Sequence, residues 1–355
     1  MNYKLNEYMK IHSSVSILLF FPLLFFAFAL PLQGQTTFRV MFYNVENLFD
    51  TEDAPKKNDN EFTPRGSRSW TNKRYYAKLT NIAKVITSVG QWDTPALIGL
   101  CEVENDKVLK DLTTYSPLKK MQYRYLLVES DDRRGIDVAL LYQRDRFKYL
   151  YHQAIPVRFP YNKRKKTRDI LHVTGQVITG DTLDVFVCHF PSRSGGQVES
   201  EPDRMYAASI VKATADSLMS VRKKANILIM GDFNDEPSDK SLSESMEAKA
   251  FPGEADKKDL YNLFLSIQQK SETGSYKFGR QWNFLDQLIV SGELLNPANP
   301  FHVLPEKTAI FSESFLLTED KSHGGKRPKK TFHGRKYEGG YSDHLPVYTD
   351  FSISK

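Results

Sequence analysis

Residues 227–235 read Ile227-Leu228-Ile229-Met230-Gly231-Asp232-Phe233-Asn234-Asp235, an apolar run that ends in polar residues. Consecutive apolar residues bounded by glycine and acidic residues are typical of a short buried strand. A single acidic residue at the end of a strand is usually only a turn residue. The segment therefore points to chemistry only if other strands of the chain end in the same way.

Other predicted strands do carry polar residues at or beside their ends. The predicted strands and their polar residues are 38–44 with Asn44 and Glu46, 96–101 with Glu102, 182–188 with His189, 227–230 with Asp232 and Asn234, 284–290 with Asp286, and 345–351 with Asp343 and His344. A further strand is predicted at 136–142. If these ends meet at one edge of the sheets, their oxygen ligands suit a hard cation such as Mg²⁺, Mn²⁺ or Ca²⁺.

Two helices are predicted between the strands. In the first, Thr71 is the expected N-cap, apolar residues from Tyr75 to Val89 recur at spacings of three and four, and Gly90 is the expected stop. The second is predicted to open at Pro202 and to run to about Arg222. Strands that sometimes pair directly and sometimes flank helices predict two packed sheets with helices outside. No repeat or change in composition divides residues 35–355, so we expect one domain.

The first 34 residues have the pattern of a secretory signal peptide. Lys4 and Lys10 precede an apolar stretch over 17–32, and Gln33-Gly34-Gln35 offers small and polar residues for cleavage. The alternative is an uncleaved membrane anchor, although the stretch is marginal for a span of about 20 apolar residues. We expect export, to the periplasm, the medium or the outer surface.

The composition supports a sizeable core and an anionic partner. Hydrophobic residues make up 40% of the 355-residue chain and charged residues 26%. Loss of residues 1–34 would lower the formal net charge from +6 to +5, which favours an anionic substrate. Cys101 and Cys188 lie in apolar runs. We expect buried free thiols, with a disulfide as the alternative in an oxidising compartment.

Several enzyme classes are disfavoured by motifs that the sequence lacks. It has no Cys/His cluster with zinc-finger spacing, no glycine-rich loop of the nucleotide-triphosphate type and no Gly-x-Ser-x-Gly.

The polar strand ends resemble motifs of one enzyme superfamily. Gly231-Asp232-Phe233-Asn234 resembles the Gly-Asp-Phe-Asn signature of the endonuclease/exonuclease/phosphatase superfamily, and Ser342-Asp343-His344-Leu345-Pro346-Val347 resembles its terminal motif. The segments 43–47, 100–103 and 285–291 are similar to its remaining strands, in the same order. Two positions depart from the pattern. Cys101 replaces the usual Gln and is expected to face away from Glu102, and Glu46 replaces an Asp found in several members.

The resemblance implies a fold and a set of roles. The fold is a four-layer α/β/β/α sandwich of two packed mixed β-sheets with outer helices. The implied catalytic residues are His189, Asp232, Asn234, Asp286 and His344. The implied metal ligands are Glu102, with Asn44, Glu46 and Asp343, and the expected ion is Mg²⁺, with Mn²⁺ or Ca²⁺ as alternatives. His344 would act as a general base or an electrostatic stabiliser, oriented by Asp286. Arg134 and Arg193 are the candidate phosphate contacts.

The substrate stays open between two classes. One is a nucleic acid or another phosphodiester, for which Tyr276, Trp282 and Tyr337 are candidate stacking residues. The other is an inositol phosphate or sphingomyelin. A catalytically inactive binding module is the third alternative. Basic stretches at 163–168 and 326–336 are either phosphate-binding surfaces or solvated loops. We infer no stable protein partner and expect a monomer.

Overall fold

The computed structural model describes residues 37–354. The expected signal peptide or anchor over 1–34 lies outside these residues. Among the described helices, none combines the length and the apolar character that a membrane span requires.

Two large mixed sheets form the centre of the domain. The first has six strands in the order β14-β19-β1-β2-β4-β3, and the second has seven in the order β5-β6-β7-β8-β13-β10-β9. The strands of the first sheet are β1 (Thr37–Leu48), β2 (Leu97–Val103), β3 (Arg124–Val128), β4 (Asp137–Tyr142), β14 (Phe301–Ile310) and β19 (Val347–Ile353). The strands of the second are β5 (Phe147–Ile155), β6 (Ile170–Val177), β7 (Thr182–His189), β8 (Asn226–Asp232), β9 (Ala248–Lys249), β10 (Leu260–Asn262) and β13 (Asp286–Ser291).

Helices and small hairpins surround the two sheets. The α-helices are α1 (Asn72–Gly90), α2 (Asp106–Tyr115), α3 (Gln197–Val221) and α4 (Phe264–Gln268). The short helical turns are η1 (Asn60–Phe62), η2 (Pro117–Met121), η3 (Ser241–Ser245), η4 (Gly292–Leu295) and η5 (Ser314–Leu316). The hairpins pair β11 (Tyr276–Phe278) with β12 (Gln281–Asn283), β15 (Leu317–Glu319) with β16 (Lys326–Pro328), and β17 (Phe332–His333) with β18 (Lys336–Tyr337).

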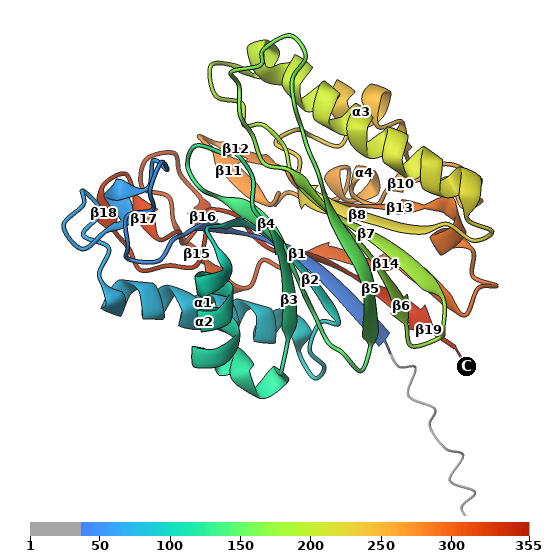
Figure 1. Ribbon diagram of the computed structural model, residues 1–355, viewed down its shortest axis with the longest axis horizontal. Coiled ribbons are helices and arrows are strands. Elements are labelled where there is room, and N and C mark those ends of the chain that lie inside the picture. The colour runs from blue at the N-terminus through green and yellow to red at the C-terminus, as the bar shows by residue number, and fades with distance from the viewer. Residues whose placement is uncertain (1–36, 355) are drawn as a thin grey trace, which may run out of the picture. The chain divides into compact units, whose positions relative to one another are not determined.

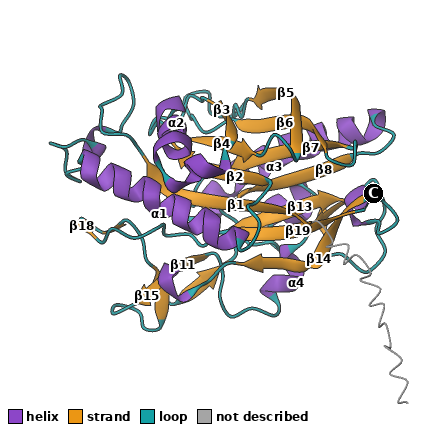
Figure 2. Ribbon diagram, turned by 90° about the horizontal axis from the view of Figure 1, so that it is seen from below, coloured by secondary structure: helices purple, strands orange, loops and turns teal. Residues whose placement is uncertain are grey.

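The elements stack in the four layers that the sequence predicted. One apolar core lies between the two sheets, a second joins the first sheet to α1 and α2, and a third joins the second sheet to α3. Figure 1 shows α1 and α2 on one side of the sheets and α3 on the other, and Figure 2 shows the same arrangement from below. Alternation along β1 explains its role, because Phe38, Val40 and Phe42 enter the central core while Met41 and Tyr43 face α1. The fold prediction is confirmed.

Each of the two predicted helices differs from the structure at one end. α1 has Thr71 as its N-cap residue and ends at Gly90, but the left-handed φ of 55° falls on Gln91. α3 begins at Gln197, so the predicted start at Pro202 was wrong. Proline lacks the N–H that the preceding helical turn would use. The buried Arg204 guanidinium stabilises that turn by donating to the Gln197 carbonyl at 2.9 Å.

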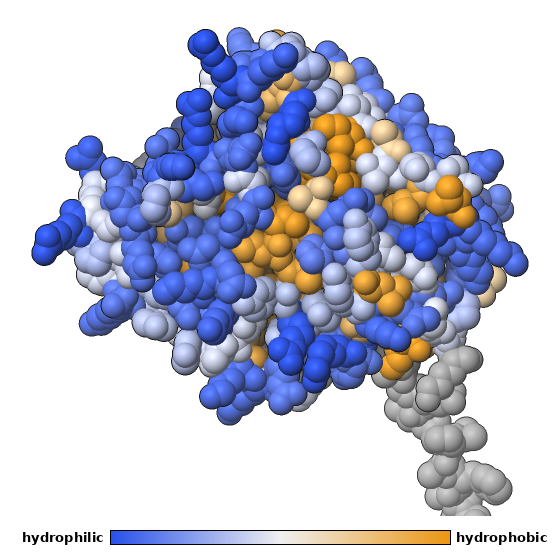
Figure 3. All heavy atoms as spheres, in the orientation of Figure 1, coloured by the Kyte–Doolittle hydropathy of each residue, from blue (hydrophilic) through white to orange (hydrophobic). Residues whose placement is uncertain are grey.

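Both cysteines are buried free thiols, as expected. Cys188 belongs to the third core and Cys101 to the central core. The surface seen in Figure 3 is mostly hydrophilic, with its apolar side chains in separate patches.

Candidate active site

A pocket opens at the rim where the carboxyl ends of β2, β7 and β8 meet. Its volume is about 570 Å³. Eight of the eleven predicted site residues line it: Glu102, Arg134, His189, Arg193, Asp232, Asn234, Asp343 and His344. Of the remaining three, Asn44 hydrogen-bonds Asp232, Asp286 pairs with His344, and Glu46 interacts electrostatically with Asp343.

Three adjacent strands of the second sheet present a row of titratable side chains. His189 on β7 is in register with Asp232 on β8, and Asp232 is in register with Asp286 on β13. Two carboxylates opposite each other on neighbouring strands repel. His344, which precedes β19 of the other sheet, compensates this repulsion. Its Nδ1 lies 2.6 Å from Asp286 Oδ2, and its Nε2 lies 3.8 Å from Asp232 Oδ2.

A direct hydrogen bond joins the two sheets at this rim. Asn44, in the second half of β1, donates from Nδ2 to Asp232 Oδ2 at 3.0 Å. The Asn44 carbonyl accepts from the Ser342 hydroxyl at 2.7 Å, and that hydroxyl accepts from the His344 backbone N–H at 3.0 Å. The relative positions of Asp232 and His344 are therefore fixed by a chain of buried hydrogen bonds.

Backbone strain is concentrated at the same rim. Glu46, Asn47, Glu102 and Asn234 all have positive φ, between 52° and 61°. The pairing of β1 with β2 and of β2 with β4 shifts register at these positions. Left-handed backbone costs an ordinary residue about 1–2 kcal/mol. Such strain persists only where the surroundings impose it, and it is common at functional sites.

Burial and neighbouring charges shift the pKa values of Asp232, His344 and His189 in different directions. Burial raises the pKa of Asp232 to about 7, and the Asp286 carboxylate also raises it. Burial alone would lower the pKa of His344, but Asp286 and Asp232 hold that pKa well above its usual value. Burial, together with Arg168 and Arg134, lowers the pKa of His189 well below its usual value. Near neutral pH the site therefore combines a neutral His189, a charged His344 and an Asp232 poised to exchange a proton.

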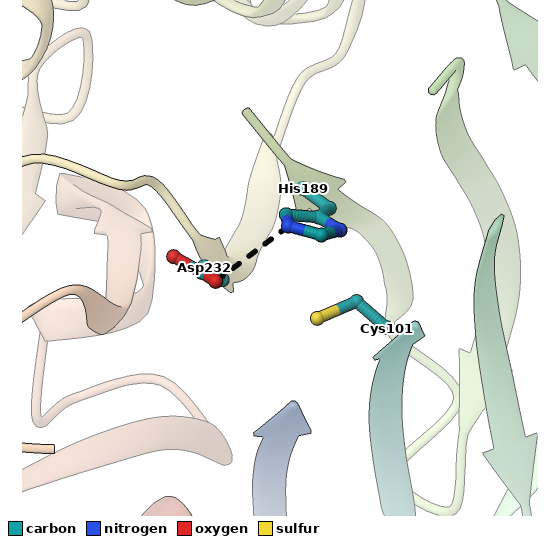
Figure 4. Close-up of side chains that lie close together, drawn as sticks. All are labelled: Cys101, His189 and Asp232. Carbon is teal, nitrogen blue, oxygen red and sulfur yellow. Dashed lines mark ion pairs between the residues drawn. The ribbon is translucent and has the colours of Figure 1, made fainter. Parts of the chain in front are cut away.

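His189, Asp232 and Cys101 form a compact cluster under the pocket. Their nitrogen, oxygen and sulfur atoms lie within 4.8 Å of one another, and His189 Nε2 lies 3.6 Å from Asp232 Oδ2 (Figure 4). Burial raises the pKa of the Cys101 thiol well above its usual value, so the thiol stays protonated and is a poor metal ligand.

Cys101 and Glu102 are neighbours in β2. Regular alternation directs Cys101 between the sheets, beneath the pocket. Glu102 reaches the pocket through its left-handed backbone.

The carboxylates of the metal set lie beside this cluster. Glu102 and Asp343 line the pocket, and Glu46 and Asp343 line a smaller adjoining cavity of about 250 Å³. Glu102 Oε2 accepts from the Asn47 backbone N–H at 2.8 Å. Burial raises the pKa of Glu46 to about 7, and Asp343 raises it further. Three carboxylates grouped in this way offer oxygen ligands that fit a hard divalent ion.

The two predicted phosphate contacts, Arg134 and Arg193, line the pocket, but their side chains differ in how firmly other residues hold them. The Arg134 side chain is 44% exposed, and its Nε lies 3.8 Å from Asp132. The Arg193 guanidinium is held by the Asn234 carbonyl at 2.7 Å and by Asp239 at 3.0 Å. Arg134 is therefore free to reach a ligand, whereas Arg193 also fixes the backbone of Asn234.

Of the three aromatic residues predicted to stack on a substrate, one lines the pocket and two do not. Tyr276 lines the pocket and packs on the His344 ring with a centroid separation of 4.7 Å. Trp282 packs against the second core, and Tyr337 lies under Arg74, so neither lines the pocket. The sequence reasoning missed Phe278, which is 74% exposed and lines the pocket from the tip of the β11–β12 hairpin. The aromatic residues around Gly279 were the signal for this hairpin.

The basic stretches are partly neutralised inside the domain. In the first, Lys165 pairs with Asp203, Lys166 pairs with Asp131, and Arg168 is buried against the His189 carbonyl. In the second, Arg327 pairs with Glu338, and Lys330 lines the smaller cavity.

Comparison with known families identifies the family of the chain. The family model described as "Endonuclease/Exonuclease/phosphatase family" matches residues 39–353. The chain belongs to this family. It is accordingly a metal-dependent phosphoric ester hydrolase, and the predicted family assignment is confirmed. No protein with a curated description matches the chain.

Solved structures of the endonuclease/exonuclease/phosphatase family share the fold at low identity. A family member from Bacteroides thetaiotaomicron is 17% identical with a TM-score of 0.57, and the match covers 90% of this chain and 98% of that one. The human Nocturnin catalytic domain with bound sulfate is 17% identical with a TM-score of 0.52, covering 90% and 95%. A mannosyl-6-phosphatase of Bacteroides thetaiotaomicron is 17% identical with a TM-score of 0.56, covering 89% and 100%.

One residue near the metal set was missed by the sequence reasoning. Lys78 of α1 is buried, and its Nζ lies 3.8 Å from Glu46 Oε2. The signal was present, because Lys78 follows Tyr75 by three residues and precedes Ile82 by four, and so falls within the apolar stripe of α1. A cation in such a stripe needs a buried partner.

Proposed function

We propose that this hydrolase is an exported, Mg²⁺-dependent phosphodiesterase, either an endonuclease or a general phosphodiesterase. The observation that carries the proposal is the grouping of His344, Asp286 and Asp232 beside Glu102 and Asp343 in one open pocket. A phosphodiester repels hydroxide, so its hydrolysis needs a proton acceptor for water and positive charge near the phosphate.

Asp232 is suited to accept the proton of the attacking water. Its pKa of about 7 makes it a far better base than an ordinary aspartate while leaving part of it ionised at neutral pH. Asn44 orients its carboxylate through the 3.0 Å hydrogen bond. Asn234 donates to the Phe190 carbonyl at 3.1 Å and is thereby held at the pocket wall to position the water or a phosphate oxygen.

The two histidines are suited to stabilise the charge that develops on the phosphate. Of the two roles expected for His344, its raised pKa favours the electrostatic one, because an imidazolium has no free lone pair to act as a base. Neutral His189 is a hydrogen-bond donor for a non-bridging or leaving oxygen. Its Nδ1 is buried and has no partner among residues 37–354.

The residues that would hold the metal are Glu102 and Asp343, with Asn44 and Glu46 as the further candidates. Their oxygen donors fit Mg²⁺, with Mn²⁺ or Ca²⁺ as alternatives. A bound divalent ion supplies positive charge to the non-bridging oxygens of the phosphate.

Two features support a diester with a planar group next to the phosphate. Tyr276 and the exposed Phe278 offer aromatic faces at the pocket, and Arg134 offers a mobile cation. Aromatic faces with basic side chains are the usual means of holding single-stranded nucleic acid.

Phosphomonoester or phospholipid hydrolysis is the alternative. The mannosyl-6-phosphatase that shares the fold supports the phosphomonoester form of this alternative.

A parallel assay of plasmid DNA, RNA, inositol phosphates and sphingomyelin tests the proposal. We expect Mg²⁺-dependent, chelator-sensitive cleavage of the nucleic acids and of bis-p-nitrophenyl phosphate, and His344→Ala should remove it. Faster release from p-nitrophenyl phosphate than from the diester, without cleavage of nucleic acid, would favour the phosphatase alternative. Export is tested separately, by fractionating cells that make the full chain and measuring the mass of the mature protein.

A further inference from the structure

Lys78 is the buried cation nearest the metal set. Its side chain is 1% exposed, and its Nζ donates to Thr331 Oγ1 and to the Tyr341 carbonyl, both at 2.6 Å. The third neighbour is Glu46 Oε2 at 3.8 Å. These contacts aim the ammonium group at the segment that leads into Asp343 and His344.

The charge of Lys78 acts on the whole carboxylate set. Burial lowers the pKa of the Lys78 ammonium group, and Glu46, Asp343 and Glu102 oppose this by favouring its charged form. Asp343 belongs to both cavities, with Glu102 on one side and Glu46 on the other. Lys78 lies on the Glu46 side. Its nearest carboxylate oxygen, Glu46 Oε2, also accepts from the Thr331 backbone N–H at 2.7 Å.

The Lys78 side chain is held where it is by the rest of α1. Asn81 donates to the Gly340 carbonyl at 2.8 Å, and Lys84 donates to the Tyr341 hydroxyl at 3.1 Å. Arg74 stacks on Tyr337 at 4.3 Å. One face of the helix thus grips the 331–341 segment at several points. For Lys78 to swing away, two short hydrogen bonds would have to break inside the protein, where unpaired donors are costly.

We propose that Lys78 is a positioning residue that serves as a resident cation on the Glu46 side of the site, so that the enzyme binds one divalent ion, between Glu102 and Asp343. Glu46 is then the partner of Lys78 rather than a metal ligand. A second divalent ion near Glu46 would have to displace or approach the buried ammonium group, which repels it. This inference rests on the ligand roles proposed above for Glu102 and Asp343.

The test is a count of bound Mn²⁺ on the full chain, by titration calorimetry and by the electron paramagnetic resonance signal of free Mn²⁺. We expect one ion for the wild type and two for Lys78→Met, which keeps most of the side-chain volume without the charge. Lys84→Met is the matched control, because Lys84 grips the same segment from the same helix. It should still bind one ion. Two ions in the wild type, or one ion in a folded Lys78→Met, would overturn the inference.

Two further variants keep the test decisive if Lys78→Met does not fold. Glu102→Gln should weaken the Mn²⁺ Kd by more than about 10-fold, and Glu46→Gln should weaken it by less than that. An equal loss of Mn²⁺ affinity in both variants would overturn the role proposed for Lys78 and leave the proposed metal site standing. An unchanged Kd in Glu102→Gln would instead overturn the proposed metal site, and the inference with it.

Discussion

Replacing Asp286 by Asn removes the partner of His344 while keeping the size of the side chain. Asp286 is fully buried, and its Oδ2 lies 2.6 Å from His344 Nδ1. A hydrogen bond to a charged group contributes about 1.5–3 kcal/mol. At about 1.4 kcal/mol per factor of ten, its loss should lower kcat roughly 10- to 150-fold, and it should also lower the pKa of His344, which Asp286 raises. KM should change little, because Asp286 does not line the pocket and acts on the substrate through His344 and Asp232.

Steady-state hydrolysis of bis-p-nitrophenyl phosphate with Mg²⁺ measures the first effect, and NMR titration of the His344 ring measures the second. Asp350→Asn is the matched control. Asp350 is also a buried aspartate, and it holds Arg39 through two hydrogen bonds of 2.7 Å at the start of β1. That variant should lose stability and keep its kcat. An Asp286→Asn enzyme with wild-type kcat, or an unchanged His344 pKa, would refute the reasoning.

Three other predictions concern separate parts of the molecule. The kcat/KM of the wild type should rise as pH increases toward about 7 and then level off, because Asp232 must lose its proton to act as a base. The apparent pKa of this profile belongs to the coupled Asp232–His344–Asp286 group. A kcat/KM that does not change with pH would count against a titrating base. Phe278→Ala should raise the KM for single-stranded DNA by about 5- to 150-fold, the equivalent of 1–3 kcal/mol for one stacked base. It should leave the KM for inositol phosphates unchanged, and equal changes would argue against stacking. Burial raises the pKa of Glu104 to about 8 in the folded protein, so this carboxyl lowers the stability of the fold increasingly as the pH rises from about 4.5 to 8. Glu104→Gln should therefore raise the free energy of unfolding by up to about 4 kcal/mol at pH 9 and change it little at pH 4. Equal effects of the substitution in denaturant unfolding at the two pH values would contradict this.

The sequence by itself determined the family, the sandwich fold and most of the pocket. The reason is local, because each motif couples an apolar strand to a polar residue at its end. Once the strands pair, Asp232, Asp286 and His189 fall into one row by register alone. The position of α1 was also readable from its apolar periodicity, since that pattern follows directly from the helical repeat.

Only the tertiary structure decided the protonation states of these residues and which charged groups pair. The periodicity of β2 gave no sign that Glu102 adopts a left-handed backbone to reach the pocket. The opposite proton states of His344 and His189 depend on burial and on residues from other strands and loops, such as Asp286 beside His344 and Arg168 near His189. Lys78 meets Glu46 because a helix and a strand pack together. Such effects depend on three-dimensional proximity, and spacing along the chain does not encode the distance between elements or the water that their contact excludes.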